Sequence, residues 1–292
     1  MNANNKLALG TAQFGLNYGV ANTAGCVSGE MADAILRSAK LSGMDTLDTA
    51  IDYGKSEEVL GDLGVDDWNV VTKLPAVPEG CPDVAAWVRA QTLASLDRLG
   101  LSRMYCLLLH RPAQLLGHIG STLYAALQSL KSEGLVAKVG ASVYGPLELD
   151  GLWPRYRLDL IQAPLNILDR RLVSSGWAAR LKDAGVELHT RSAFLQGLLL
   201  MPSEKRPERF NRWSDIWQEW DRWLLATGLS PVQACLRYAN SLHDIDRVVI
   251  GVDTVMQLNE ILAAFDGVLD SLPAFKPLKN DLLINPPSWN QL

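Results

Sequence analysis

The chain has 292 residues, of which 48% are hydrophobic and 20% charged, and its formal net charge is −5 at pH 7. This composition is that of a globular protein with a large core, and it excludes a predominantly disordered chain. The negative net charge and the lack of a Lys/Arg-rich run argue against nucleic acid or an anionic membrane surface as a partner.

The cysteines and the N-terminal sequence indicate the compartment. Cys26, Cys81, Cys106 and Cys235 are scattered without a CxxC pair, which is typical of reduced cysteines that pack in a core. The N-terminus lacks the apolar run of a signal peptide, and no segment approaches about 18 uninterrupted apolar residues. We therefore expect a cytoplasmic protein that does not enter a membrane.

Along the chain, the apolar pattern alternates between short buried runs and segments of helical period. Eight runs rich in Leu, Val and Ile are predicted to be strands, at residues 7–9, 46–47, 70–72, 104–109, 136–141, 158–162, 186–190 and 248–250. Helices are predicted at residues 29–41, 56–60, 84–99, 123–132, 176–183, 213–226 and 231–240.

Strands that alternate with helices require parallel crossovers, and eight of them over about 250 residues predict an α/β fold, a (β/α)8 TIM barrel. No GxGxxG follows a strand and no GxxxxGK[ST] is present, which lowers the alternative of an open nucleotide-binding sheet. We expect residues 1–292 to form a single domain. The polar segment 201–212 is predicted to be an inserted loop, and the proline-containing segment 272–292 an extended C-terminal tail.

Four tryptophans, Trp213, Trp217, Trp220 and Trp223, recur at intervals of four, three and three. Such a stripe on one helix face is typical of a packing surface in the core. The alternatives are a self-association patch or a wall of the substrate pocket.

The carboxyl ends of three successive predicted strands carry ionisable side chains. Asp48 closes the second strand, Lys73 the third and His110 the fourth, and Tyr53 follows Asp48 by five residues. Singly, each has a structural explanation as a turn cap, a solvated lysine, an amphipathic rim tyrosine or a core histidine. In a parallel barrel the strand ends meet at one face, so we expect the four side chains to line one catalytic pocket.

The chemistry of this set is specific. A tyrosine hydroxyl has an ordinary pKa of about 10 and is a weak acid near neutrality. A buried ammonium beside it favours the phenolate, and a carboxylate behind the lysine keeps the lysine charged. Asp48, Lys73 and Tyr53 therefore predict a proton relay, with the His110 imidazole orienting a carbonyl oxygen. The sequence shows no metal-ligand cluster and no Ser/His/Asp arrangement, so an organic cofactor is the expected electron source.

Two other functions stay open at this point. Lys73 could act as the Schiff-base lysine of an aldolase-type barrel, with Tyr53 as acid and base. Alternatively, the barrel could bind a cofactor without catalysis, as a regulatory subunit.

Eight ordered segments of the sequence match one family pattern: LGTAQFGLNYG, DTAIDYG, VVTK, LLLHRP, GLVAKVGAS, IQAPLNIL, RSAFLQGLLL and VIGVDTVMQLNE. With them the chain resembles the aldo-keto reductase family over residues 7–265. The resemblance implies a barrel that binds NAD(P)H across the carboxyl ends of its strands and reduces an aldehyde or ketone. It also implies that Tyr53 is the general acid, Asp48 and Lys73 its tuning pair, and His110 the substrate-orienting group.

The resemblance further implies a set of cofactor-binding residues. Ser142 and Gln162 would hold the nicotinamide carboxamide, and the planar guanidinium of Arg191 would stack on the nicotinamide ring. The other cofactor-binding residues would contact the ribose, the pyrophosphate and the adenosine. They are Gly10, Thr11, Ala12, Ser192, Leu195, Gln196, Gly197, Gly251, Asp253, Thr254, Gln257 and Glu260.

The chain departs from the family pattern at several of these positions. Val143 and Ile261 stand where Asn is usual, so hydrogen bonds to the cofactor are lost or replaced there. The family favours NADPH, whose 2′-phosphate prefers Arg or Lys, yet the adenosine segment offers Asp253 and Gln257. We expect NADPH, with NADH as the alternative.

Asn17, Tyr18 and Tyr144 lie in loops at the same face and are the expected substrate-binding residues. Together with Arg170 and Arg171, they favour a polar or anionic carbonyl compound, for example one derived from a sugar. We expect a small-molecule substrate and a monomer or small homo-oligomer.

Overall fold

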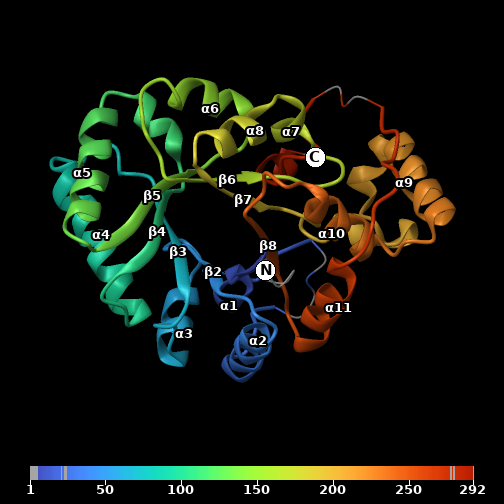
Figure 1. Cartoon of the computed structure of the whole chain (residues 1–292), viewed down its shortest axis with the longest axis horizontal. Coiled ribbons are helices and arrows are strands. Elements are labelled where there is room, and N and C mark those ends of the chain that lie inside the picture. Colours follow the sequence, from blue (N-terminus) through green and yellow to red (C-terminus); the bar gives the residue numbers. More distant parts are fainter. Residues whose placement is uncertain (1–5, 21, 23–24, 277, 279, 292) are drawn as a thin grey trace.

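The computed structural model describes residues 6–20, 22, 25–276, 278 and 280–291. Its eight strands form a closed barrel in which each strand pairs in parallel with the next and β8 pairs with β1. The strands are β1 (Leu7–Gly10), β2 (Thr46–Asp48), β3 (Asn69–Leu74), β4 (Met104–Leu109), β5 (Val136–Ser142), β6 (Leu160–Pro164), β7 (Glu187–Arg191) and β8 (Arg247–Gly251). The predicted (β/α)8 barrel is confirmed (Figure 1).

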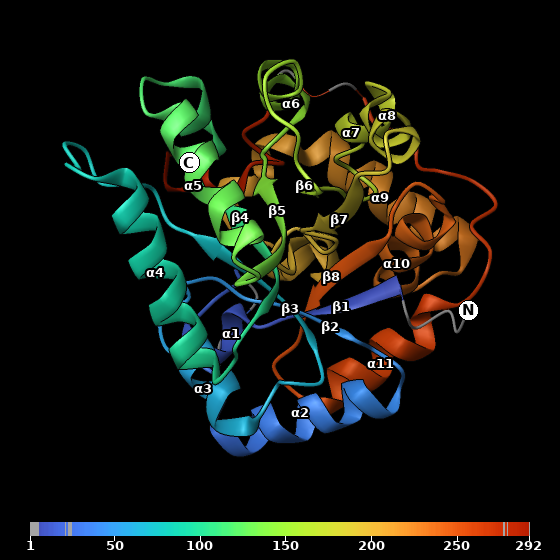
Figure 2. The same ribbon diagram turned by 60° about the vertical axis from the view of Figure 1, so that its left-hand side comes forward.

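Helices surround the barrel on its outer side, as the two views show (Figures 1 and 2). They are α1 (Ala12–Gly15), α2 (Gly29–Leu41), α3 (Ser56–Leu63), α4 (Val84–Leu99), α5 (Gly120–Ser132), α6 (Pro146–Leu152), α7 (Arg171–Ser174), α8 (Trp177–Asp183), α9 (Ser214–Thr227), α10 (Pro231–Ser241) and α11 (Val255–Phe265). Short 3-10 turns lie at Pro112–Leu116, Leu198–Leu200, Ser203–Lys205, Glu208–Trp213 and Pro286–Gln291. No helix in the described part of the chain is long and apolar enough to cross a membrane.

Three helix ends show how local sequence sets the boundaries. Helix α2 begins after Ser28, whose side chain accepts the backbone N–H of Met31, and helix α4 begins after Asp83, which accepts that of Ala86. These caps satisfy donors that would otherwise lack a partner. At its other end α4 stops at Gly100, which adopts a left-handed conformation with φ 65°. Both helices span the predicted residues.

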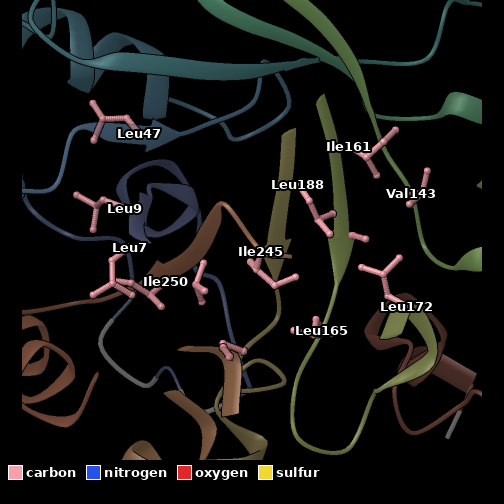
Figure 3. Close-up of a cluster of buried hydrophobic side chains, with 14 of the residues drawn as sticks. Leu7, Leu9, Leu47, Val143, Ile161, Leu165, Leu172, Leu188, Ile245 and Ile250 are labelled. Atoms are coloured by element: carbon pink, nitrogen blue, oxygen red, sulfur yellow. The ribbon is translucent and has the colours of Figure 1, made fainter. Parts of the chain in front are cut away.

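Most strand residues are apolar because each strand is buried between the barrel interior and the helical layer. Leu7, Leu9, Leu47, Ile161 and Ile250 belong to the main cluster of buried side chains (Figure 3). A second, smaller cluster consists of Val71, Cys106, Leu108 and Leu160. The four cysteines are free, and Cys106 and Cys235 are buried as predicted for packing cysteines, whereas Cys26 is exposed.

The insertion and the tail are less extended than their sequences suggest. Segment 201–212 contains 3-10 turns, and the tail ends in the 3-10 helix Pro286–Gln291, so it is not extended throughout. The two prolines open that helix, where a missing N–H costs no intrahelical hydrogen bond. The tail folds back because Trp289 is buried against Phe210 of the insertion, with ring centroids 4.9 Å apart.

The tryptophan stripe is a packing surface. Trp217, Trp220 and Trp223 are buried, and Trp213 is partly buried against the same core. The indole N–H of Trp220 donates to the Leu199 carbonyl at 3.2 Å, and that of Trp217 donates to the Phe210 carbonyl at 2.9 Å. Helix α9 is thereby fastened to the segment that follows β7.

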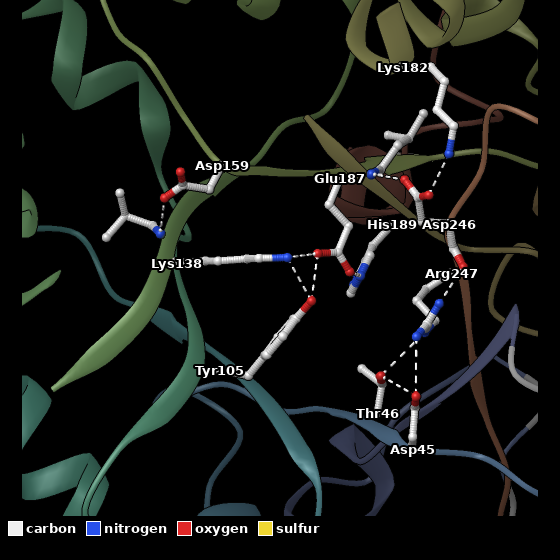
Figure 4. A network of polar contacts seen from close by, with 12 residues as sticks. Asp45, Thr46, Tyr105, Lys138, Asp159, Lys182, Glu187, His189, Asp246 and Arg247 are labelled. Atoms are coloured by element: carbon white, nitrogen blue, oxygen red, sulfur yellow. Dashed lines mark hydrogen bonds and ion pairs between the residues drawn. The ribbon is translucent and has the colours of Figure 1, made fainter. Parts of the chain in front are cut away.

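A polar network fills the barrel at the amino ends of the strands (Figure 4). Glu187 accepts hydrogen bonds from Lys138 and from the Tyr105 hydroxyl at 2.7 Å, and its other oxygen lies 2.7 Å from His189 Nε2. Burial alone would raise the pKa of Glu187, but these partners lower it to about 2. This network lies at the end of the barrel opposite to the candidate site.

Candidate active site

The four predicted catalytic residues meet at the carboxyl ends of adjacent strands. Asp48 is the last residue of β2, Lys73 lies near the end of β3, and His110 directly follows β4. The backbone N–H of His110 donates to the Leu74 carbonyl at 2.9 Å, which fixes it against β3. Tyr53 lies in the turn between β2 and α3.

Two glycines allow the Tyr53 turn to approach α1. A Cβ at Gly15 would lie 1.8 Å from the Tyr53 carbonyl oxygen, and a Cβ at Gly54 would lie 2.4 Å from that of Gly15. Gly54 also has φ +55°, which disfavours larger residues. The glycines at these two positions therefore hold Tyr53 at the barrel mouth.

Lys73 is 1% exposed and forms an ion pair with Asp48, its Nζ lying 2.6 Å from Asp48 Oδ1. It also donates to the Thr49 carbonyl at 2.8 Å. Burial lowers the pKa of an ammonium group, but the Asp48 charge, the neighbouring Tyr53 and the hydrogen bond to Asp48 outweigh it, so the pKa of Lys73 is raised. Lys73 is consequently a buried, permanently charged ammonium at neutral pH.

Gln162 supports the ion pair from the other side of the barrel. Its Nε2 donates to Asp48 Oδ2 at 2.5 Å, and its Oε1 accepts a hydrogen bond from the Ser142 hydroxyl at 3.4 Å. The resemblance places Ser142 and Gln162 at the nicotinamide carboxamide. In this structure both are buried, and they are connected to the predicted proton relay through Asp48.

Tyr53 contacts both Lys73 and His110. The Lys73 ammonium lies 5.0 Å from the Tyr53 ring centroid, and the Tyr53 and His110 rings meet edge to face with centroids 6.1 Å apart. Burial, assisted by the positive charges of Lys73, Arg111 and Arg191, lowers the pKa of His110 to about 4. The imidazole is therefore neutral at pH 7 and can donate a neutral N–H.

A groove of about 490 Å³ opens at this face and runs outward from Tyr53 to the first turns of α10 and α11. Its volume lies in the range typical of ligand pockets. The predicted residues that line it are Gly10, Thr11, Ala12, Tyr18, Asp48, Tyr53, Arg191, Ser192, Gln196, Gly197, Gly251, Asp253, Gln257 and Glu260.

The other predicted site residues do not line the groove. Lys73, Ser142 and Gln162 are buried behind Asp48, and Leu195 is buried in the core. Thr254 caps α11 by accepting the backbone N–H of Gln257 at 3.2 Å. His110 contacts the Tyr53 ring, Tyr144 packs under Arg191, and Asn17 is exposed outside the groove.

The loop 192–197 forms one wall of the groove in an uncommon backbone conformation. Ser192, Leu195 and Gln196 have positive φ angles of 66°, 50° and 54°, which cost energy in residues other than glycine. The sequence does not identify Asn166 as part of the site, yet its buried side chain donates to the Ser192 carbonyl at 3.1 Å. Its Oδ1 accepts the backbone N–H groups of Leu168 and Asp169. Asn166 thus connects the loop after β6 to the loop after β7.

The expected roles of two arginines in binding substrate find no support in their contacts. Arg171 pairs with Asp169 and Asp281, and Arg170 donates to the Pro273 carbonyl at 3.1 Å. Both guanidinium groups therefore hold the tail. Arg111 lies closer to the predicted catalytic residues: it donates to the Tyr144 hydroxyl at 3.0 Å, and its charge helps to lower the pKa of His110.

The groove fits an extended dinucleotide better than a metal ion. Within the described residues, no group of three or more His, Cys, Asp or Glu side chains could hold a metal. Arg191 extends over the Tyr144 ring at 4.7 Å and presents a flat cation near the catalytic end. Ser192, Gln196 and Gly197 border the middle of the groove, and Asp253, Gln257 and Glu260 border its outer end.

Comparisons with known proteins agree with this geometry. The profile of the Aldo/keto reductase family matches residues 6–272. No curated protein sequence gives a significant match. An aldo-keto reductase from Bacillus halodurans is 21% identical, with a TM-score of 0.68 over 92% of this chain and 88% of that chain. A glycerol dehydrogenase from Gluconobacter oxydans is 20% identical, with a TM-score of 0.68 over 90% and 87%. At this identity the two structures show a common fold.

Proposed function

The chain belongs to the aldo/keto reductase family and is therefore an NAD(P)-dependent oxidoreductase, and on that premise we propose that it reduces an aldehyde or ketone to the alcohol with Tyr53 as the proton donor. Asp48 and Lys73 would tune this acid, and His110 would orient the carbonyl oxygen. The bound nicotinamide would supply the hydride. The protein would orient the substrate, hold the charged groups beside the acid and donate the proton.

The observation that carries this proposal is the buried ion pair beside Tyr53. Lys73 keeps its charge because Asp48 lies 2.6 Å away, and the Lys73 ammonium is 5.0 Å from the Tyr53 ring centroid. A positive charge at this distance stabilises the phenolate that remains after the tyrosine has given up its proton. We propose that this charge helps Tyr53 to give its proton to a developing alkoxide.

His110 would act as a neutral hydrogen-bond donor. With its pKa lowered to about 4, the imidazole does not compete with Tyr53 as an acid at pH 7. Its ring lies against Tyr53, so a carbonyl oxygen bound by the tyrosine hydroxyl would also lie close to the imidazole. The two groups would then fix the carbonyl from two directions.

The contacts of Lys73 disfavour a Schiff-base mechanism. A Schiff-base lysine attacks as the neutral amine, and it needs access to the substrate. The Lys73 ammonium is almost fully buried, and it donates to both Asp48 and the Thr49 carbonyl. Borohydride treatment with an aldehyde should therefore leave no adduct on Lys73. The intact relay also favours catalysis over a purely regulatory role.

For the substrate we propose a small polar or anionic carbonyl compound, with Tyr18, Tyr144 and Arg111 as its nearest polar contacts. The Tyr144 hydroxyl accepts a hydrogen bond from Arg111 and the Tyr144 ring packs against Arg191, so one tyrosine contacts two guanidinium groups. Of the two nicotinamide cofactors, NADPH is the one that the resemblance favours. NADH differs from it by lacking the phosphate on the adenosine ribose.

One experiment tests the proposed function without knowledge of the natural substrate. The full-length protein is titrated with NADH and NADPH while its tryptophan fluorescence is followed, and a panel of small aldehydes is then tested for oxidation of the reduced cofactor. Binding of at least one dinucleotide and turnover that is lost in Tyr53→Phe would support the proposal. If neither dinucleotide binds at high micromolar concentration, the proposal is wrong.

A further inference from the structure

The outer end of the groove has an acidic character that the proposed function does not require. Asp253 follows β8, Glu260 lies on α11, and both line the groove. Among the described residues that line it, Arg191 is the sole lysine or arginine, and it lies over Tyr144 near the catalytic end. The outer end therefore presents two carboxylates to a ligand and no compensating cation.

The helix α11 begins at this end, and its N-terminus is already capped. Thr254 accepts the backbone N–H of Gln257 at 3.2 Å, and the Gln257 side chain accepts the backbone N–H of Asp253 at 2.6 Å. An uncapped helix N-terminus binds phosphate through such N–H groups. Here these two donors are occupied by the side chains of the same turn.

The helix α10 borders the groove in the same manner. Ser230 and Gln233 form a reciprocal capping box, in which Ser230 accepts the backbone N–H of Gln233 and the Gln233 side chain accepts that of Ser230. Pro231, the next residue, has no N–H to offer. At each helix start, side chains of the first turn therefore occupy two of the N–H groups that a phosphate would use.

We infer that the chain selects NADH over NADPH, and that Asp253 and Glu260 are the residues that determine this specificity. The inference rests on the proposed function, because it requires the nicotinamide to bind at the Tyr53 end. The adenosine ribose then lies toward the outer end. A 2′-phosphate brought there would meet two like charges without an arginine or lysine partner.

Asp253 also suits the cofactor that lacks this phosphate. Burial raises the pKa of Asp253, and its interaction with Gln257 offsets part of that rise. One carboxylate oxygen lies 3.5 Å from the Asn22 side-chain amide, which helps to fix its orientation. A carboxylate held in this way accepts a hydrogen bond from a ribose hydroxyl and repels a phosphate at the same position.

The test measures binding alone, by titrating the full-length protein with NADH and with NADPH and following tryptophan fluorescence or heat. We expect NADH to bind at least roughly tenfold more tightly, since one unfavourable contact of about 1.4 kcal/mol is a factor of ten. In the variant Asp253→Asn/Glu260→Gln, the ratio of the two dissociation constants should fall to within about threefold. In the unaltered protein, a higher salt concentration should bring the ratio of the two dissociation constants closer to one, because salt screens the repulsion between the carboxylates and the 2′-phosphate.

A matched control removes one negative charge elsewhere. Asp183 is exposed on α8 and does not line the groove, so Asp183→Asn should leave the ratio unchanged. If the unaltered protein binds NADPH as tightly as NADH, or if the double variant keeps the original ratio, the inference is wrong while the proposed function stands. If neither dinucleotide binds, the proposed function itself is wrong.

Discussion

The Lys73 ammonium lies 5.0 Å from the centroid of the Tyr53 ring, on a side chain that is only 1% exposed. Because the charge is buried, its effect on the tyrosine is screened weakly by water. The relationship predicts that proton donation depends on Tyr53 and that cofactor binding does not. We expect Tyr53→Phe to lower kcat by roughly 10²- to 10⁴-fold. Stopped-flow turnover and fluorescence titration measure the two effects separately, and a variant with unchanged kcat would show that another group donates the proton.

The Asp48 carboxylate is predicted to matter for stability as well as for catalysis. In Asp48→Asn the Lys73 ammonium stays buried without its counter-charge, so we expect the unfolding free energy to fall by about 3 kcal/mol. In Asp48→Asn/Lys73→Met neither position carries a charge, and stability should return toward the original value without recovery of activity. Urea denaturation measures the stability of each variant. If the double variant is no more stable than Asp48→Asn, the ion pair is not the cause of the loss.

The lowered pKa of His110 predicts a specific dependence of stability on pH. Its folded value of about 4 lies below the ordinary value of 6.5, so the unfolded chain binds more protons between these values. Stability contributed by this residue is therefore present above pH 6.5 and is lost as the pH falls toward 4. The loss should amount to about 3 kcal/mol for a shift of this size. The free energy of unfolding is measured by denaturation at pH 7 and pH 4.5 for the unaltered protein and for His110→Gln. Its fall between the two pH values should be smaller in the variant.

Asn166 is predicted to position the cofactor loop without touching the reacting atoms. Its side chain holds the Ser192 carbonyl, and Ser192 has a positive φ angle of 66°. We expect Asn166→Ala to weaken dinucleotide binding roughly tenfold, because the loop then relaxes from its binding conformation and must be ordered again by the ligand. Leu181→Ala, at a fully buried position on α8, provides a control that is destabilised far from the groove. Equal loss of affinity in both variants would assign the effect to stability alone.

The barrel could be predicted because its signal is repeated along the chain. Most strands are buried and contain a short apolar run, and the long helices show a helical apolar period, with side-chain caps at α2, α4, α10 and α11. Helices α6 and α11 escaped prediction for different reasons. Helix α6 has only seven residues, and α11 begins inside the segment predicted to bind the adenosine of the cofactor.

Part of the candidate site could be predicted for a geometric reason. Asp48 and Lys73 lie at the ends of neighbouring parallel strands, so a barrel necessarily brings them together. The hydrogen bond from Gln162 to Asp48 links residues 114 positions apart, and no local pattern indicates it. The left-handed conformation of Leu195 and Gln196 is equally hidden, because neither residue is a glycine. The contacts of Arg170 and Arg171 with the tail could not be predicted, because the sequence does not reveal that the tail folds back onto them.

Asp48 receives Lys73 from β3 on one oxygen and Gln162 from β6 on the other. The carboxylate therefore connects, at the mouth of the barrel, two strands that are not neighbours in the sheet. Both partners are strand residues, so this connection does not depend on the loops that surround the groove. The outer loops, but not the β2–α3 turn that carries Tyr53, could accordingly be exchanged with loops from other barrels to alter which carbonyl compound is accepted, while Asp48, Lys73 and Tyr53 keep their alignment. For protein engineering, the chain thus combines a reaction centre that is kept unchanged with outer loops that can be replaced to change substrate recognition.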